Sequence, residues 1–344
     1  MATAELNFKT EHRFANALLS LKTAFIKILS SLICVMGGGA IGREGPTIQI
    51  SAAIFHFMGE KFRPIWPGLN HHSLIVAGGA AGIASAFNTP LGGIIFAIEE
   101  LITEHFHNLK SVLILAVVVA GLISQWLLGP YLYFGFPALA PATFSSLPMV
   151  LTTGILCGIA GATFGRLLHF LSVQRKRLKT RLAQVIAALL CGVVIACIAL
   201  AWGVPTVGPG KQVITGFLFH GDAANWQLVI GRFMSSVISY MSGCGGGIFA
   251  PSLATGAAMG SQIAVLSGAA DGNLLVLLGM IAFLTGVTRA PFTSFVLVLE
   301  MTDRHSAIIM MMLAAAIAYA ASKLVEAESF YHHVKAGFLE QKME

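Results

Sequence analysis

Charged side chains are scarce in this chain. Lysine, arginine, aspartate and glutamate together make up 10% of its 344 residues, whereas hydrophobic residues make up 56%. Soluble domains carry about 25% charged residues, so this composition and a mean hydropathy of +0.81 exclude an ordinary soluble protein and favour one embedded in a lipid bilayer. The net charge of +6 does not indicate a nucleic-acid partner, because no aromatic residues interleave with its main basic cluster.

Motifs of enzymes and metal sites are also absent. The sequence contains no His-Glu-x-x-His zinc motif and no Gly-x-Ser-x-Gly nucleophile motif, and Gly208-Pro209-Gly210-Lys211 lacks the spacing of a phosphate-binding loop. The five cysteines lie in apolar or glycine-rich stretches without disulfide or metal spacing. We therefore expect no enzymatic activity, no metal and no cofactor. No signal peptide is visible in residues 1–22.

Long apolar runs are present instead. Residues 111–128, 150–170, 185–202 and 306–324 are each long enough to cross a bilayer. Other apolar stretches are shorter and are interrupted by glycine or proline, which predicts partial or re-entrant helices. The basic cluster at residues 175–181 lies between two of the long runs, so the positive-inside rule predicts a cytoplasmic loop there. The sequence therefore predicts an all-α polytopic membrane protein.

The chain contains an internal repeat. Residues 27–46 read KILSSLICVMGGGAIGREGP, and residues 232–251 read RFMSSVISYMSGCGGGIFAP, so that the serine pair, several glycines and the final proline coincide at an offset of 205. Further downstream the spacing agrees between Gly78, Pro90 and Glu99 in one half and Gly279, Pro291 and Glu300 in the other. We predict a first repeat at residues 1–146, a second at 147–327, and a C-terminal segment at 328–344 that carries Tyr331.

Each repeat places a glycine-rich break inside an apolar stretch. A glycine-rich run leading into Pro46 or Pro251 predicts the start of a helix with proline in its first turn. Such a helix start offers unpaired N–H groups and the positive end of the helix dipole, and two of them can converge on a small anion. Glycines can also serve only to pack membrane helices tightly. Paired breaks in corresponding positions of two repeats favour a transport site.

Glu44 lies directly in the first break. Ionisable residues within apolar stretches are costly and usually functional. A charged carboxylate in this position would compete with a bound anion, and protonation would neutralise it and let it move. The sequence therefore predicts that Glu44 links proton and anion movement, with a structural ion pair between Glu44 and Arg43 as the alternative.

Two further acids, Glu99 and Glu100, close the helix that is expected to start near Pro90. A functional site and a solvated helix end both fit Glu99. Glu300 matches Glu99 in the second half, whereas Met301 stands opposite Glu100, so Glu100 is specific to the first half. Arg289, in the turn before Pro291, is expected to pair with a carboxylate.

These motifs together resemble the CLC family of chloride channels and proton/chloride antiporters. Gly42-Arg43-Glu44-Gly45-Pro46 matches the G-R-E-G-P signature of that family, and Gly247-Ile248-Phe249-Ala250-Pro251 matches its G-x-F-x-P signature. The resemblance continues through residues 86–100, 289–303 and 330–331, and it covers about residues 19–339. It implies an inverted repeat of tilted and broken helices, and a homodimer with one pathway in each subunit.

The resemblance also implies roles for particular residues. Glu44 is similar to the external gating glutamate, and Glu100 to the internal proton-transfer glutamate that is typical of exchangers. The anion-binding groups would be the backbone N–H groups around two helix starts and one hydroxyl, supplied by Arg43, Gly45, Ile248, Phe249, Ala250 and Tyr331. We therefore expect proton-coupled chloride antiport in a prokaryotic inner membrane.

Several alternatives stay open. A passive chloride channel is one, although Glu100 argues against it. A fluoride exporter fits the signatures less well, and a non-transporting membrane scaffold is an alternative of another class. The G-S-G-I-P signature of the family, which supplies an inner serine ligand, is missing. At the offset of 205, the second-half loop Gly208-Pro209-Gly210 corresponds to residues 3–5. We therefore expect that about two N-terminal helices of roughly 20 residues are missing, that transport is impaired, and that Ser30 lacks a partner.

Overall fold

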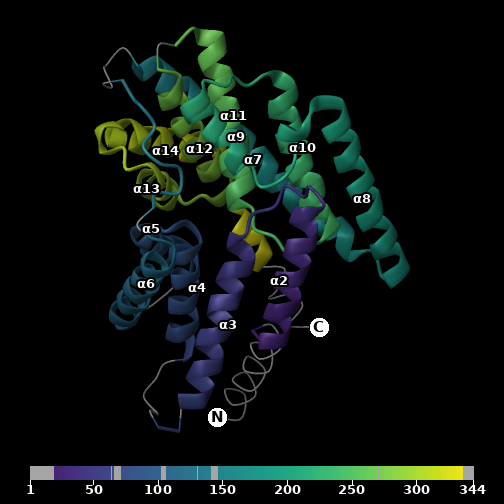
Figure 1. The fold of residues 1–344 in the computed structure, drawn as a ribbon, viewed down its shortest axis with the longest axis vertical. Coiled ribbons are helices and arrows are strands. Elements are labelled where there is room, and N and C mark those ends of the chain that lie inside the picture. The colour runs from purple at the N-terminus through teal and green to yellow at the C-terminus, as the bar shows by residue number, and fades with distance from the viewer. Residues whose placement is uncertain are drawn as a thin grey trace.

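Figure 1 shows a computed structural model, which describes residues 19–62, 64–65, 71–101, 106–129, 131–140, 146–269 and 271–335. Within these ranges the chain is helical and forms no named strand, which confirms the predicted all-α class. The helices of the first half are α2 (Leu21–Met36), α3 (Glu44–Phe62), α4 (His71–Phe87), α5 (Pro90–Phe96) and α6 (Phe106–Leu128). A π-helical turn, Ala97–Leu101, continues α5.

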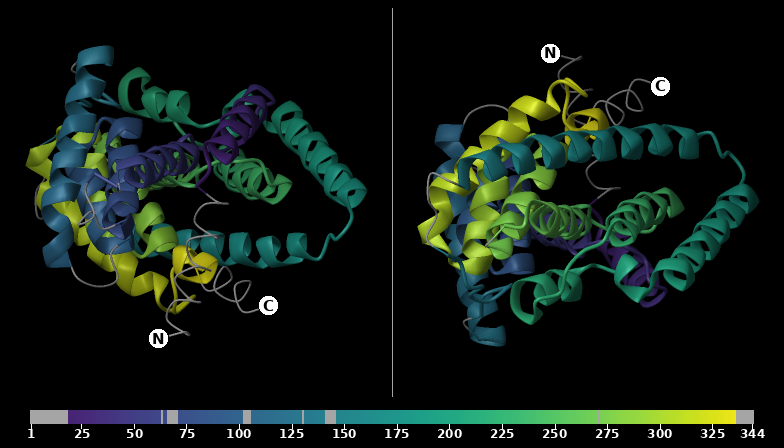
Figure 2. Two further views of the ribbon diagram at one scale, coloured as in Figure 1. Left: turned by 90° about the horizontal axis from the view of Figure 1, so that it is seen from below. Right: turned by 90° about the horizontal axis from the view of Figure 1, so that it is seen from above.

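The second half begins with the longest helix. Its α-helices are α7 (Leu147–Lys176), α8 (Arg181–Trp202), α9 (Lys211–Thr215), α10 (Trp226–Ser242), α11 (Phe249–Ser267), α12 (Gly272–Thr288), α13 (Pro291–Thr302) and α14 (Ile308–Ser322). Short 3-10 turns occupy Val204–Thr206 and His305–Ala307, and a π-helical turn occupies Gly216–His220. Figure 2 shows α7 running along one edge of the molecule, with α8 returning at an angle from its far end.

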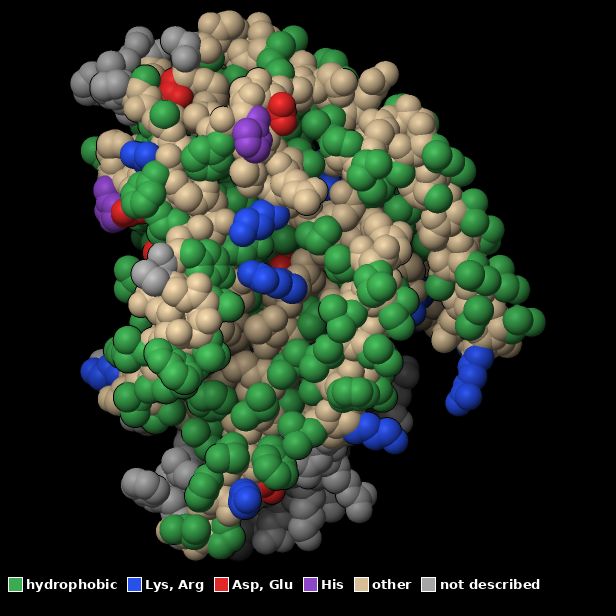
Figure 3. Space-filling model, viewed as in Figure 1, with side chains coloured by type: hydrophobic (Ala, Val, Ile, Leu, Met, Phe, Trp, Pro, Cys, Tyr) green, Lys and Arg blue, Asp and Glu red, His purple; other side chains and the backbone are tan. Residues whose placement is uncertain are grey.

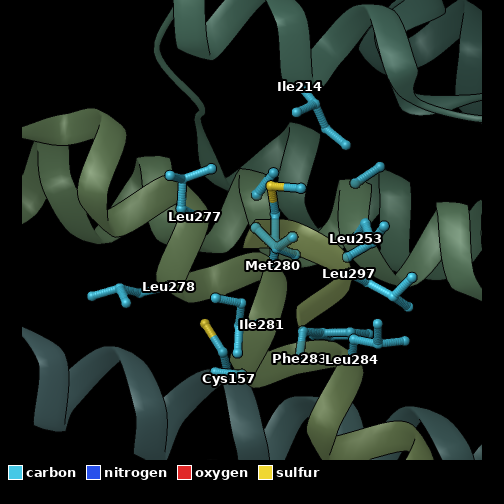
Figure 4. Close-up of a cluster of buried hydrophobic side chains, with 14 of the residues drawn as sticks. Cys157, Ile214, Leu253, Leu277, Leu278, Met280, Ile281, Phe283, Leu284 and Leu297 are labelled. Carbon is cyan, nitrogen blue, oxygen red and sulfur yellow. The ribbon is translucent and has the colours of Figure 1, made fainter. Parts of the chain in front are cut away.

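The centre of the molecule is α12. This helix is apolar on all sides and is buried along nearly its whole length, as expected of a helix enclosed by others. Figure 4 shows side chains of α12, including Leu277, Met280 and Phe283, surrounded by residues of neighbouring helices. A Cβ atom on Gly161 of α7 would collide with the carbonyl oxygen of Phe283. Glycine therefore permits a close approach of two membrane helices at this crossing.

Five helices in the described part of the chain are long and apolar enough to cross a membrane. They are Lys110–Leu128, Leu147–Lys176, Arg181–Trp202, Phe249–Ser267 and His305–Ser322. Four of them confirm the runs predicted from the sequence, and the remaining one follows the second break. Large apolar side chains such as Trp126 of α6 and Leu200 of α8 are exposed, and apolar side chains extend over much of the surface in Figure 3. The chain is therefore an integral membrane protein.

The two glycine-rich breaks lie against each other. The Gly42 N–H donates to the Gly247 carbonyl at 2.8 Å, and the Gly247 N–H donates to the Gly42 carbonyl at 2.7 Å. These glycines are equivalent in the repeat. The boundaries at residues 146 and 327 remain a prediction. Residues 3–5, the expected counterpart of the Gly208-Pro209-Gly210 loop, lie outside the described residues.

Serines from the preceding helices hold both breaks. The Ser239 hydroxyl of α10 accepts a hydrogen bond from the Ala40 N–H at 2.8 Å, and the Ser30 hydroxyl of α2 accepts one from the Gly245 N–H at 3.2 Å. Each half therefore supplies a serine to the break of the other half. The prediction that Ser30 lacks a partner is wrong, because a backbone N–H of the second break bonds to it.

The prediction for Arg289 is also wrong. This residue ends α12 in the left-handed region, at φ 64°. Its guanidinium donates to the backbone carbonyls of Ser322 and Glu326, at 2.9 and 2.5 Å, instead of pairing with a carboxylate. The last carbonyls of a helix lack partners within that helix, and the carbonyl of Ser322 at the end of α14 gains one from Arg289.

Candidate functional site

Two helix starts converge where the glycine-rich breaks meet. Helix α3 begins at Glu44 and α11 begins at Phe249, each directly after its break, and Pro46 and Pro251 lie buried in the first turns. These positions confirm the predicted helix starts. A Cβ atom on Gly45 would lie 3.0 Å from the backbone of Gly247, so only a glycine lets the two backbones approach this closely.

Glu44 occupies the meeting point of these helix starts. Its side chain is 0% exposed. One carboxylate oxygen, Oε1, accepts a hydrogen bond from the Ala250 N–H at 2.9 Å, whereas the buried Oε2 has no hydrogen-bond partner among the described residues. The carboxyl group therefore lies at the N-terminus of α11, where unpaired N–H groups and the helix dipole favour negative charge.

Arg43 is directed away from this carboxylate. It is exposed, donates from its Nη2 atom to the Ala86 carbonyl at 2.7 Å, and places its Cζ atom 5.4 Å from the centre of the Tyr133 ring. No ion pair between Arg43 and Glu44 occurs in the described structure. This arrangement excludes the alternative in which the two residues form a structural ion pair.

Phe249 connects Glu44 to a group of buried aromatic rings. Its ring centre lies 5.6 Å from that of Phe96, 6.5 Å from that of Phe87 and 6.3 Å from that of Tyr331. Tyr331 follows α14, at the C-terminal end of the described chain, and is close enough to both Glu44 and Glu100 to interact electrostatically. The structure thus brings the predicted residues of both helix starts and Tyr331 into one region.

Glu99 caps a helix of the other half. Its carboxylate accepts hydrogen bonds from the N–H groups of Phe292 and Thr293, at 3.1 and 2.7 Å, and from the Thr293 hydroxyl at 2.7 Å. These groups form the first turn of α13, where backbone N–H groups lack helical partners. Glu99 is therefore a half-buried helix cap rather than a solvated helix end.

Glu300 makes the equivalent contact in the opposite direction. Its carboxylate accepts hydrogen bonds from the N–H groups of Leu91 and Gly92, at 3.0 and 2.6 Å, in the first turn of α5. Each glutamate thus caps the helix that carries the other one. Sequence reasoning missed these contacts, although the equal spacing of Pro90 to Glu99 and of Pro291 to Glu300 was the available signal.

Glu100 lies beside Glu99 in the π-helical turn that ends α5. It is half-buried, and it forms no hydrogen bond or ion pair within the described ranges. A half-buried carboxyl without a fixed partner can gain and lose a proton without breaking a structural interaction, which is the requirement for a proton-transfer group.

Known proteins provide an independent comparison. The family model described as voltage gated chloride channel matches residues 4–323. A ClcB-like protein of Ralstonia nicotianae, named as a chloride channel protein, is 32% identical over 92% of this chain and 75% of that protein. The H(+)/Cl(−) exchange transporter ClcA of Vibrio parahaemolyticus is 28% identical over 89% of this chain and 68% of the transporter.

A solved structure agrees with these relatives. A slow cyanobacterial Cl⁻/H⁺ antiporter superposes with a TM-score of 0.81 at 27% sequence identity, over 93% of this chain and 77% of the antiporter. The predicted fold class, a polytopic bundle of tilted and broken helices, is thereby confirmed.

Proposed function

Because the chain belongs to the voltage gated chloride channel family, we propose that it exchanges chloride for protons across the membrane. The observation that carries this proposal is the buried Glu44 carboxylate at the N-terminus of α11. A carboxylate in an anion-binding position can be replaced by chloride only when it moves or loses its charge. Protonation removes the charge of Glu44 and frees its side chain to move. The binding of a proton is thereby linked to the binding of chloride.

In the proposed mechanism each residue of the site has its own role. Chloride binds at the backbone N–H groups of Phe249 and Ala250 when the neutral Glu44 side chain leaves them. The hydroxyl of Tyr331 supplies a further hydrogen bond to the anion on the inner side. Glu100 exchanges protons with the cytoplasm, since it is half-buried and has no fixed partner among the described residues. Backbone N–H groups around Arg43, Gly45 and Ile248 complete the anion path.

The charge pattern orients the path in the membrane. Arg175, Lys176, Arg177, Lys179 and Arg181 lie between α7 and α8, so the positive-inside rule places this connection in the cytoplasm. The other ends of these helices, Leu147 and Trp202, then face outward, together with the linker that precedes α7. Tyr331 belongs to the inner side because its neighbour His333 stacks on His169 of α7, at 4.4 Å between ring centres.

The assembly is proposed to be a homodimer in a prokaryotic inner membrane. The relatives named above come from bacteria, which supports the proposed location in a prokaryotic inner membrane. In this proposal the second subunit covers the face of α5 and α13 that carries Leu91, 59% exposed, and Phe292, 56% exposed. Chloride and protons are the transported partners, and each subunit carries its own path.

The test is a flux measurement with the purified chain in liposomes. A chloride gradient should drive protons against their own gradient. Dissipation of the membrane potential with valinomycin should increase the flux of both chloride and protons. A passive channel, which the name of the Ralstonia relative favours, would move chloride without protons. A scaffold would move neither ion. Chloride flux without uphill proton movement would therefore overturn the exchange mechanism.

A further inference from the structure

Two free cysteines, one from each half, meet beside the glycine-rich breaks. Cys34 lies near the C-terminal end of α2, and Cys244 lies in the second break. Their side chains are close enough to share a hydrogen bond between the two sulfur atoms. The Cys34 side chain is directed toward the breaks, because a Cβ atom added to Gly39 would collide with its Sγ atom. The spacing of the cysteines along the chain does not reveal this pair.

The internal repeat shows that the pair belongs to one side of the breaks only. At the offset of 205, Cys34 corresponds to Ser239 and Cys244 to Gly39. The Ser239 hydroxyl accepts a backbone hydrogen bond from the first break at 2.8 Å, and the Ser30 hydroxyl accepts one from the second break at 3.2 Å. Serine hydroxyls thus hold both breaks, so the two thiols are not needed for that purpose.

A cation lies beside one of the two thiols. The guanidinium of Arg175, on α7, packs so closely on Gly243 that a Cβ atom added there would collide with it. Arg175 is also close enough to Cys244 to interact with it electrostatically. A nearby cation favours the thiolate, which is the nucleophilic form of cysteine. Cys244 is therefore the thiol that attacks an oxidant, and Cys34 is the thiol placed to react next.

Neither thiol is enclosed by the protein. Cys34 and Cys244 are both half-buried, and reactive cysteines are found in partly exposed, electropositive surroundings of this kind. Arg175 belongs to the basic cluster that the positive-inside rule assigns to the cytoplasm. Cytosolic reductants keep thiols reduced, and the disulfides that do form there are usually transient and redox-sensing.

We propose that Cys34 and Cys244 are a redox modification site, which hydrogen peroxide oxidises to a reversible disulfide between α2 and the second break. The Cys244 thiolate attacks one oxygen of the peroxide, the O–O bond breaks, and the leaving hydroxide takes up a proton to become water. The sulfur of Cys34 then attacks the resulting sulfenic acid. The S–S bond forms as the S–O bond breaks, and the Cys34 proton leaves with that hydroxide as a second water. The two thiols lose two electrons, which the peroxide gains.

Peptide mapping of the purified full chain tests the site without a transport measurement. After treatment with hydrogen peroxide, two of the five thiols should no longer react with a maleimide. A non-reducing digest should contain one linked pair of peptides, which carry Cys34 and Cys244, and dithiothreitol should restore both thiols. A digest without this linked pair, or with Cys244 linked to Cys191 instead, would overturn the proposal.

Cys191→Ser and Cys34→Ser are matched variants. Cys191, on α8, is another thiol close enough to Cys244 to interact with it electrostatically, so Cys191→Ser removes a neighbouring thiol and should leave the disulfide intact. Cys34→Ser introduces the side chain found at the equivalent position of α10. In this variant the sulfenic acid of Cys244 should persist and be trapped by dimedone. Equal trapping in Cys34→Ser and in the unmodified chain would show that Cys34 does not react with the sulfenic acid, and the proposal would be wrong.

Thermal unfolding in detergent provides a second readout. A cross-link between residues far apart in the sequence restricts the unfolded chain, so peroxide should raise the midpoint of the unmodified chain by about 5 °C. Cys34→Ser should show no rise after the same treatment. A rise of equal size in both proteins would assign the stabilisation to other thiols and contradict the disulfide.

The expected consequence for transport rests on the proposed function. Cys244 precedes the start of α11, whose Ala250 N–H bonds to Glu44, and the glycines around Cys244 give the second break conformational freedom. A disulfide to α2 removes part of that freedom. Peroxide should therefore cause a loss of chloride flux that dithiothreitol reverses, in the unmodified chain but not in Cys34→Ser.

The two proposals fail separately. A chain that forms the linked peptides but exchanges no ions would retain the disulfide site and lose the proposed exchange function. A chain that exchanges the ions but forms no linked peptides would lose the disulfide site alone. Chloride flux that is unchanged in the fully cross-linked chain would show that the disulfide does not regulate transport.

Discussion

At the scale of single residues, Glu44 is the residue on which the proposed mechanism depends most. It is fully buried and bonds through one oxygen only. Glu44→Gln keeps the shape but cannot carry a negative charge or accept a transferable proton. We expect proton transport to fall by about a hundredfold, the usual contribution of a positioned proton-transfer group, while chloride flux persists. The measurement is chloride-driven proton uptake in liposomes, and retained uptake would remove this role.

Glu100 is tested in the same assay from the inner side. Glu100→Gln should abolish proton uptake and leave chloride flux, because it removes the carboxyl that we propose exchanges protons with the cytoplasm. Glu328→Gln is a suitable control, since Glu328 is exposed and pairs with His332 at 2.6 Å in the C-terminal segment. If chloride drives as much proton uptake in Glu100→Gln as in Glu328→Gln, Glu100 is not a proton-transfer group.

Bromide tests the inner part of the path. Crystals grown in bromide should show anomalous density beside the Phe249 N–H and the Tyr331 hydroxyl. Tyr331→Phe should weaken the peak at the hydroxyl and leave the peak at the N–H. Density confined to the protein surface would show that these groups do not bind the anion.

At the scale of helices, the reciprocal caps join the two halves. The helical segment from Pro90 to Leu101 is held by Glu300 at its start and carries Glu100 near its end. Glu300→Ala leaves two N–H groups without their charged acceptor and should cost about 2 kcal/mol of folding free energy. Proton coupling should weaken as well, because Glu100 loses its support, whereas chloride flux should persist.

Thermal unfolding in detergent measures the cost of this substitution. Glu99→Ala should lower the midpoint to a similar extent. The double variant should lose less than the sum, because both caps hold the same pair of helices together. Full additivity, or a Glu300→Ala midpoint equal to that of Glu328→Gln, would show that the reciprocal caps do not hold α5 and α13 together.

These helices show what a sequence pattern can and cannot reveal. A glycine-rich run that leads into a proline fixes a helix start locally, so the starts at Glu44 and Phe249 were predictable. The partners of Glu99, Arg289 and Tyr133 lie far away in the sequence, and no local pattern specifies them. Glu99 therefore could not be distinguished from a solvated end, and Arg289 was assigned a carboxylate where backbone carbonyls bind it.

At the scale of the whole molecule, hydropathy predicts membrane insertion but not the order of packing. The helices α8 and α12 are both strongly apolar, yet α8 exposes most of its side chains and α12 almost none. Lipid and protein are similarly apolar surroundings, so an apolar side chain does not indicate which of the two it meets. Gly279 and Gly286 of α12 carry that information, because each lies where the backbone of another helix approaches.

Gly286 of α12 tests this packing. A Cβ atom there would collide with the backbone carbonyl of Gly158 on α7, and a backbone atom cannot rotate away as a side chain can. Gly286→Ala should therefore separate the two helices and cost about 3 kcal/mol, the upper range for an overpacked core. Gly192→Ala is the matched control, because Gly192 lies in α8 with no atom within 4 Å of the added methyl group. We expect a lower thermal midpoint and a smaller monodisperse fraction in detergent for Gly286→Ala alone. Equal midpoints for the two variants would mean that the α7–α12 crossing does not hold the centre of the molecule together.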